Sequence, residues 1–462
     1  MSDEKYKTAP VPTEKMPTGI PYIVGNEAAE RFSFYGMRGI LVLFMTKYIL
    51  DASGEADYMS EGDATTIFHL FVATAYFFPL LGSLLSDVFL GKYKTILLLS
   101  IVYCSGHLAL AIDATRIGLF IGLILISIGA GGIKPCVSAH VGDQFGRRNK
   151  HLLSKVFGWF YIAINMGAFF SSLLIPELLK QYGPHVAFGV PGILMLIATI
   201  LFWMGRNKFI HIPPSGWSKF KKDTFSKEGL QALLNLSVLY YIFLPVFWAL
   251  FDQTGSTWVI QGTKMNSMVG GYKLSAAQVQ AFNPFFILLL VPTFNYVVYP
   301  LIDKVFPLTP LRKISIGFFL AAASFAIIAF IQIQIDNSSD NPPHILWQAI
   351  PYLVMTAGEV MVSITCLEFS YTQAPKSMKS FIMSLFFLSV TVGNILTAGV
   401  SKLNVIDESH SHLERANYFW FFSGLMLVAA VLFIFVAQFY RGKTHIQDEE
   451  QDTSQAREEG IH

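Results

Sequence analysis

Charged residues are scarce in this 462-residue sequence, where Asp, Glu, Lys and Arg make up only 14%. Soluble domains carry about 25%, so the composition argues against a soluble chain. Cysteine is scarcer still: Cys104, Cys136 and Cys366 all lie in apolar stretches, which excludes a disulfide framework. The net charge of only +2 creates no basic field, so we expect no nucleic-acid partner.

Hydrophobic residues, by contrast, make up 53% of the sequence. A bilayer core of about 30 Å is crossed by about 20 mostly apolar residues, because a helix satisfies its own backbone hydrogen bonds in lipid. The fold class that this composition predicts is an all-α membrane protein. Stretches of the required length predict twelve transmembrane helices, at 21–49, 64–86, 95–113, 117–140, 156–179, 186–205, 232–260, 278–301, 313–334, 346–370, 380–400 and 417–440.

The Lys and Arg residues test this count independently. With both termini cytoplasmic, the cytoplasmic segments carry 23 of them and the outer segments carry 6. Membrane proteins concentrate these residues in cytoplasmic loops. One missed or extra helix would reverse the bias for everything downstream, so the distribution favours an even number of spans.

The longest polar connection, 206–231, divides the predicted helices six plus six. An acid followed by basic residues ends both the second and the eighth helix, at Asp87 and at Asp303, which are 216 residues apart. An ordinary cytoplasmic loop rich in Lys and Arg would also produce this pattern at either helix end. The repetition of the pattern, however, indicates that the chain consists of two duplicated halves. Parallel halves around a midplane site describe the major facilitator superfamily fold, with twelve helices in two six-helix bundles and alternating access.

This division predicts five regions. They are a cytoplasmic N-terminal segment, an N-terminal six-helix bundle, a cytoplasmic linker, a C-terminal six-helix bundle and a cytoplasmic tail, at 1–20, 21–205, 206–231, 232–440 and 441–462.

The first predicted helix carries charged side chains within the bilayer core. Placing a charge there costs free energy, so these side chains are expected to face a cavity or a partner. At 100° per residue, five polar side chains fall within an arc of about 140° on one side. We therefore expect this side to line a wet pathway. The five are Glu27, Glu30, Arg31, Tyr35 and Arg38.

The fourth predicted helix places Lys134 after Gly129-Ala-Gly-Gly-Ile and before Pro135. The small residues allow another helix to approach closely. Lys134 needs an acid at this depth, and Glu27 or Glu30 is the expected partner. The alternative is that Lys134 extends to the cytoplasmic surface, although Pro135 and the residues that follow place it deep.

The second half contains two acids with no adjacent base in sequence, Asp252 and Glu359. In the first half, His69 lies two turns before Tyr76, on the same face of the second helix. A proton-binding role for His69 competes with that of an ordinary core histidine. The amides Asn165, Asn283 and Asn394 lie within three further helices, where each could simply bond a neighbouring helix.

Together these residues predict a cavity with opposite charges on its two walls. The basic residues Arg31, Arg38 and Lys134 lie in the first half, whereas the unpaired acids Asp252 and Glu359 lie in the second. Such a cavity suits a zwitterion, with its carboxylate at the basic wall and its ammonium at the acidic wall. Charge-assisted, bidentate bonds favour Arg for the carboxylate.

The segment Glu27-Ala-Ala-Glu-Arg-Phe-Ser-Phe-Tyr-Gly36 is similar to the signature ExxERFxYYG of a known family. This family is the proton-coupled oligopeptide transporters (POT or PTR family) of the major facilitator superfamily, and further motifs resemble it as well. Gly132-Ile-Lys-Pro135 and Phe160-Tyr-Ile-Ala-Ile-Asn-Met-Gly167 resemble its second signature region. Phe247-Trp-Ala-Leu-Phe-Asp-Gln253 and Leu367-Glu-Phe-Ser-Tyr-Thr-Gln-Ala-Pro375 look like the animal-type peptide transporters in particular. The resemblance covers about 20–440.

The resemblance implies a role for each matching position. Arg31, Arg38 and Lys134 are expected to bind the peptide carboxylate. Asn165, Asn283 and Glu359 are expected to bind the peptide ammonium. Tyr35, Tyr76 and Trp248 are expected to line the pocket. Proton coupling is expected at Glu27, Glu30, His69 and Asp252.

The sequence departs from the family in three places. Phe34 stands where the signature has its first Tyr, which removes a hydroxyl. Leu236 and Asn295 stand where animal members have an Arg and an Asp, so that ion pair is absent. The loop 335–345 is too short for the extracellular domain of animal members, and 206–231 is too short for the two extra helices of many bacterial ones. A compact bacterial member of animal-like type fits best.

The resemblance implies proton-coupled uptake of di- and tripeptides by a multi-pass protein of the inner (plasma) membrane. Protons are the expected coupling ion, with no other cofactor and no metal, and the chain is expected to function as a monomer. The alternatives are a relative that carries nitrate, another anion or drug-like molecules, and a peptide sensor that transports nothing. An enzyme is not expected, because the sequence offers no nucleophile–base pair and no metal-ligand cluster.

Overall fold

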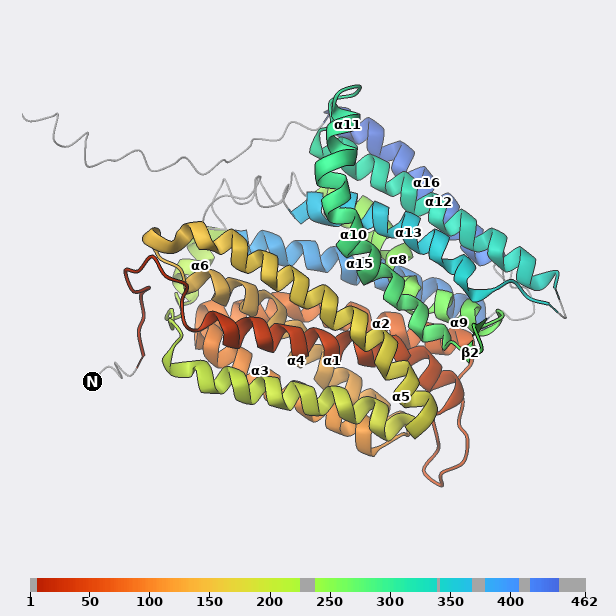
Figure 1. Cartoon of the computed structure of the whole chain (residues 1–462), viewed down its shortest axis with the longest axis horizontal. Helices are drawn as coiled ribbons and strands as arrows, with labels where there is room; N and C mark the ends of the chain where they lie inside the picture. The colour runs from red at the N-terminus through yellow and green to blue at the C-terminus, as the bar shows by residue number, and fades with distance from the viewer. Residues whose placement is uncertain (1–5, 225–236, 339–340, 368–378, 407–415, 440–462) are drawn as a thin grey trace, which may run out of the picture.

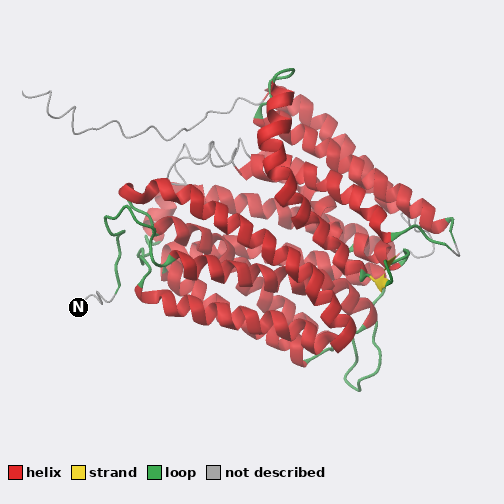
Figure 2. Cartoon of the chain, viewed as in Figure 1, coloured by secondary structure: helices red, strands yellow, loops and turns green. Residues whose placement is uncertain are grey.

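The computed structural model describes residues 6–224, 237–338, 341–367, 379–406 and 416–439. Nearly all of this part of the chain is helical (Figure 2). Its strands form one hairpin, in which β1 (Met268–Val269) pairs with β2 (Tyr272–Lys273). Leu236 and the motif residues 368–375 lie outside the described residues.

The first half of the chain forms one helical bundle, drawn red to lime in Figure 1. The backbone of Gly183 has a φ of +79°, so α5 is two consecutive helices rather than one. Five elements therefore supply the six spans predicted for this half. They are α1 (Ile20–Lys47), α2 (Glu61–Leu84), α3 (Lys92–Ile112), α4 (Arg116–Asp143) and α5 (Leu153–Met204), and the short α6 (Trp217–Thr224) follows them.

The second half forms a second bundle, drawn green to blue in Figure 1. The seventh predicted helix is broken at 252–256, because Ser256 has the non-helical dihedral angles φ −127° and ψ −88°. Short π-helical turns interrupt or extend several others. The helices are α8 (Leu244–Phe251), α9 (Thr257–Thr263), α10 (Phe282–Thr293), α11 (Tyr299–Asp303), α12 (Pro310–Asp336), α13 (Ala349–Glu359), α15 (Lys379–Ile406) and α16 (Ala416–Phe439).

Nine helices in the described residues are long and apolar enough to cross a membrane. One of them, Lys155–Asn207, contains both spans of α5. The charged helix α1 and the broken helix α8–α9 are not among the nine. The chain is therefore a multi-pass membrane protein, and the twelve predicted spans are compatible with this count.

Small residues bring the helices of the first bundle into close contact, as the sequence predicted for Gly129–Gly132. A Cβ added to Gly82 of α2 would lie 2.2 Å from the carbonyl oxygen of Gly132 in α4. A Cβ on Gly129 would lie 2.6 Å from the Cβ of Tyr103 in α3. No side chain fits at either position, so these glycines determine how closely α2 and α3 pack against α4.

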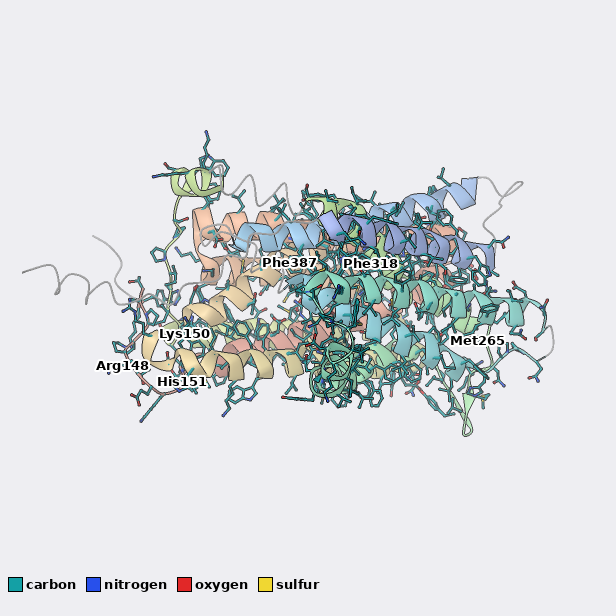
Figure 3. All side chains as sticks on the ribbon, turned by 90° about the horizontal axis from the view of Figure 1, so that it is seen from above. Arg148, Lys150, His151, Met265, Phe318 and Phe387 are labelled. Carbon is teal, nitrogen blue, oxygen red and sulfur yellow. The ribbon has the colours of Figure 1, made fainter. Side chains whose placement is uncertain are left out.

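We call the end of the molecule beside β1 and β2 the hairpin end, and the opposite end, beside residues 206–216, the linker end. Figure 3 shows Met265 toward the former and Arg148, Lys150 and His151 toward the latter. At the hairpin end the two bundles are joined by side chains, whereas in Figure 1 they diverge toward α6 and α11. The joining pairs are Lys264–Glu61 at 2.8 Å, Lys402–Asp63 at 2.9 Å, and a hydrogen bond from Tyr272 to Glu177.

Candidate functional site

A cavity of about 470 Å³ lies between the two bundles. It has walls from α1, α2, α4 and α5 on one side and from α8, α10 and α13 on the other. The remaining predicted site residues, Glu30, His69 and Asp252, do not line it and are buried next to it. Ten of the thirteen predicted residues do line it: Glu27, Arg31, Tyr35, Arg38, Tyr76, Lys134, Asn165, Trp248, Asn283 and Glu359.

Arg31 forms ion pairs with both acids of its own helix. Its Nε lies 2.8 Å from Glu27 Oε1 and 2.7 Å from Glu30 Oε2. Only the contact with Glu27 has hydrogen-bond geometry, and both carboxylate oxygens of Glu30 are buried without a hydrogen bond. Among the described residues, the charge of Glu30 is therefore balanced by proximity to Arg31 rather than by hydrogen bonds.

Lys134 does not form the predicted ion pair with Glu27 or Glu30. Within the described residues its Nζ has no hydrogen-bond partner, and it lies 3.7 Å from the ring centroid of Tyr76 and 4.7 Å from that of Phe34. Arg31 pairs with Glu27 instead because the two lie four residues apart on the same helix, and its Nε also lies close to Glu30. The aromatic faces stabilise the ammonium of Lys134 without neutralising it.

Asp252 is not the unpaired acid that the sequence suggested. Its Oδ1 accepts a hydrogen bond from Nη2 of Arg38 at 2.5 Å, and both side chains are buried. Arg38 belongs to α1 and Asp252 follows α8, so this ion pair joins the two bundles. The broken helix α8–α9 makes the contact possible, because it places Asp252 at the end of a helix.

His69 reaches Asp252 through an amide rather than directly. Its Nδ1 lies 2.6 Å from Asn394 Oδ1, and Asn394 Nδ2 donates to Asp252 Oδ2 at 2.7 Å. The other ring nitrogen, Nε2, lies 2.8 Å from Ser256 Oγ. The resulting chain of hydrogen bonds connects α2 with the broken helix α8–α9 and with α15.

Glu359 is the acid of the second bundle that faces the cavity. Its Oε2 accepts a hydrogen bond from Asn283 Nδ2 at 2.6 Å, so the structure brings these two predicted residues together. Asn165, on the opposite wall, donates to the carbonyl oxygen of Tyr161. Trp248 lies in the same cavity, and its ring packs against Phe386 of α15.

The described charges in and beside the cavity nearly balance. Three are positive and four are negative, which leaves −1 when every acid is ionised: Arg31, Arg38 and Lys134 against Glu27, Glu30, Asp252 and Glu359. Arg31 forms ion pairs with Glu27 and Glu30. Arg38 forms an ion pair with Asp252. Lys134 and Glu359 are the remaining cation and anion, and they belong to opposite bundles.

Several residues of the site have no specific role that the sequence pattern predicts. Ser256 and Asn394 complete the bonds of His69, and Gln280 donates to the carbonyl oxygen of Gly39 across the bundle interface at 2.9 Å. Asn394 was noted only as a buried amide. The break at Ser256 is preceded by Thr254-Gly255, a weak signal that could have suggested it.

No group of three or more His, Cys, Asp or Glu that could hold a metal occurs among the described residues.

Comparisons of the sequence identify related proteins. A protein-family model described as the POT family matches residues 93–226 and 217–421. Solute carrier family 15 member 1 of Homo sapiens is 34% identical over 452 residues, covering 85% of this chain and 62% of that protein. Peptide transporter 3 of Caenorhabditis elegans is 38% identical over 397 residues, covering 75% and 55%. The chain thus spans less than two thirds of the length of these relatives.

Comparisons with solved structures identify transporters of the same family. A crystal structure of an auto-inhibited POT family peptide transporter superimposes with a TM-score of 0.86 and 36% identity, covering 94% of this chain and 99% of that one. The structure of the POT family transporter PepTSo superimposes with a TM-score of 0.80, also at 36% identity, with the same coverage. These matches confirm the major facilitator fold predicted from the sequence.

Proposed function

This chain belongs to the POT family, and from that premise we propose that it is a symporter that couples the uptake of di- and tripeptides to protons. It works by alternating access, as a monomer, in the inner (plasma) membrane of a bacterial cell. Both termini and the linker end lie in the cytoplasm, in keeping with the 23 to 6 distribution of Lys and Arg.

One observation supports this proposal above the others: within the described residues, Lys134 and Glu359 form no ion pair, and they lie on opposite walls of one cavity. A peptide is a zwitterion with its two charges at opposite ends. Its carboxylate binds Lys134, together with the guanidinium groups of Arg31 and Arg38. Its ammonium binds Glu359 and the amide oxygens of Asn283 and Asn165.

The size and walls of the cavity support the same substrate class. Small-molecule sites have volumes of about 300–1,000 Å³, and the cavity of about 470 Å³ lies in the lower part of that range. A carrier of many peptides has to accept different side chains, so its specificity has to rest on the peptide termini. Aromatic walls supply adaptable apolar contact, here from Trp248, Phe386 and Phe387.

Proton binding acts on the two buried ion-pair clusters. A proton on Glu27 or Glu30 releases Arg31 to bind the peptide carboxylate. A proton on the His69–Asn394–Asp252 chain weakens the Arg38–Asp252 pair, which holds the bundles together toward the hairpin end. One charge crossing 100 mV supplies about 2.3 kcal/mol, and one pH unit supplies about 1.4 kcal/mol per proton.

Dialanine uptake into proteoliposomes with an imposed pH gradient and membrane potential tests this proposal. We expect gradient-driven uptake by the unmodified protein, and its loss in Lys134→Ala and in Glu359→Gln. The matched controls are Lys47→Ala and Glu55→Gln, which change the same residue types at exposed positions. Undiminished uptake by Glu359→Gln would remove the ammonium assignment.

The same assay separates the alternatives. A peptide sensor would bind dialanine but accumulate none. A carrier of nitrate or another anion would transport that anion in preference to dialanine, and would not need Glu359. The presence of Glu27 and Glu30 beside Arg31 favours the peptide carrier over the anion carrier.

A further inference from the structure

The helix α1 has a second polar face, which points away from the cavity into the first bundle. Asn26, Glu30 and Ser33 follow one another at the i, i+4 and i+7 positions and are each 0% exposed. Glu27, Arg31 and Arg38, by contrast, line the cavity. Glu30 lies at the boundary between the two faces, because it contacts Arg31 and yet does not line the cavity.

The helix α3 of the same bundle also carries a buried polar stripe. Ser100, Tyr103 and His107 lie at i, i+3 and i+7 and are at most 1% exposed. Two glycines of neighbouring helices make room for them. A Cβ on Gly129 would lie 2.6 Å from the Cβ of Tyr103, and a Cβ on Gly192 would lie 2.9 Å from that of His107.

These interior side chains have unused hydrogen-bonding capacity within the described chain. The atoms concerned are Asn26 Nδ2 and Oδ1, both carboxylate oxygens of Glu30, Ser100 Oγ, Tyr103 Oη and both ring nitrogens of His107. A buried polar group without a partner costs about 1–3 kcal/mol. Polar interiors of this kind bind ordered water, which makes about three hydrogen bonds to such groups.

The polar groups are arranged by depth. Both α1 and α3 begin at the linker end, and a helix rises 1.5 Å per residue. Tyr103 therefore lies about 17 Å along α3 and Glu30 about 15 Å along α1, whereas Ser100 lies at about 12 Å and Asn26 at about 9 Å. In α4, His140 lies about 5 Å from the linker end, and it is buried with Nε2 unpartnered.

Few ionisable groups lie near the buried polar side chains of the first bundle. The ionisable groups near Glu30 are Glu27, Arg31 and Lys134. Cys104 is adjacent to Tyr103, and Tyr103 interacts electrostatically with Glu30. The charged and titratable neighbours of His140 are His211 and Lys92, both at the linker end.

We propose that Glu30, Tyr103, Ser100 and Asn26 form a proton pathway through the interior of the first bundle. The proton bound by Glu30 leaves along it toward the linker end, without passing through the peptide cavity. The Glu30 carboxyl group gives its proton to a bound water. The hydroxyl of Tyr103 accepts a proton from the water on one side and donates its own to the next, so its charge is unchanged. One proton leaves for each carboxylate formed.

This pathway deepens the proposed function and depends on it. A peptide in the cavity covers the wall that carries Glu27 and Arg31. An exit behind that wall lets Glu30 ionise while the peptide is still bound. Arg31 then pairs again with Glu30, which weakens its hold on the peptide carboxylate and promotes release.

Tyr103→Phe tests the pathway, because it removes the hydroxyl and keeps the ring that packs on His107, at 4.9 Å between centroids. A proton-transfer group contributes about 10²-fold or more, so we expect uptake driven by a pH gradient to fall by at least about tenfold. Counterflow, in which labelled dialanine exchanges for unlabelled with no net proton movement, should be unchanged. Tyr418→Phe, a Tyr of α16 in the other bundle, is the control.

A second pair of variants lies on one helix. Ser100→Ala should also lower driven uptake and spare counterflow, whereas Ser105→Ala, an exposed serine of α3, should change neither. Driven uptake equal to that of the unmodified protein in Tyr103→Phe would overturn the pathway. So would an equal loss of driven uptake and counterflow, because that indicates a packing role. Absence of dialanine counterflow in the unmodified protein would instead overturn the proposed function.

Discussion

Arg38 of the first bundle lies 2.5 Å from Asp252 of the second, and their side chains are only 9% and 3% exposed. This ion pair is buried between the bundles, and Asn394 donates to the second carboxylate oxygen of Asp252. A movement that separates the bundles at the hairpin end has to break it. Neutralising Asp252 is therefore expected to favour that movement.

Asp252→Asn tests this expectation. The substitution leaves Arg38 buried without its counter-ion, and breaking a buried pair in this way costs about 3–5 kcal/mol. We expect the hairpin end to open more often, seen as longer distances between spin labels at Glu61→Cys and Lys264→Cys. Asp336→Asn, an exposed acid at the end of α12, should leave the distances unchanged. Equal distances in Asp252→Asn and the unmodified protein would contradict the role of the pair.

The exposed pair Lys264–Glu61 should act in the same direction but more weakly. Surface ion pairs contribute about 0–1 kcal/mol. Lys264→Glu alone places two acids together and should increase labelling of a cysteine introduced at the hairpin end. The double variant Lys264→Glu with Glu61→Lys restores opposite charges and should return labelling toward the original level. If the double variant labels like the single one, the pair does not hold the bundles together.

Gly82 and Gly142 should respond oppositely to an added side chain. A Cβ on Gly82 would lie 2.2 Å from the backbone oxygen of Gly132, so Gly82→Val has to force α2 and α4 apart. Overpacking of this kind costs about 1–3 kcal/mol or more, and we expect a lower Tm or loss of the folded protein. In α4, no atom of the described residues lies within 4 Å of a Cβ placed on Gly142. Gly142→Ala should be neutral or stabilise the helix by up to about 1 kcal/mol.

An ion pair between Asp57, in the loop between α1 and α2, and Arg116 predicts that the stability of the fold depends on pH. Arg116 donates to both carboxylate oxygens of Asp57, at 2.5 and 2.7 Å, and these bonds lower the pKa of Asp57. An acid with a lowered pKa stabilises the folded state above its ordinary pKa of about 3.9, and this contribution is lost as the pH falls through the lowered value. The Tm difference between the unmodified protein and Asp57→Asn should shrink from pH 6 toward pH 3. A difference that stays constant over this range would contradict the assignment.

The polar face of α1 shows how far local pattern can predict a site. Helical spacing grouped Glu27, Arg31, Tyr35 and Arg38, and all four line the cavity. The same spacing places Glu30 at the edge of that arc, and in the structure Glu30 is buried next to the cavity without lining it. A helix has a regular rotation per residue, so the face of each residue follows from its number alone.

The choice of ion-pair partners could not be predicted in this way. Lys134 is predicted to pair with Glu27 or Glu30. In the structure both acids pair with Arg31 of their own helix, whereas Lys134 lies over aromatic rings of α1 and α2. His69 and Asp252 are both predicted to couple protons, yet Asn394 lies between them. Each outcome depends on distances of a few ångströms between side chains of different helices.

Hydropathy, charge bias and helical period predict the spans, their division into halves and the polar face of α1, because each is a property of neighbouring residues. The pairing of Arg38 with Asp252 joins residues 214 positions apart. Their contact, and the placement of Lys134 and Glu359 on opposite walls with no ion pair among the described residues, arise from how the two bundles pack. A short-range electrostatic contact is set by that packing, which no local pattern specifies.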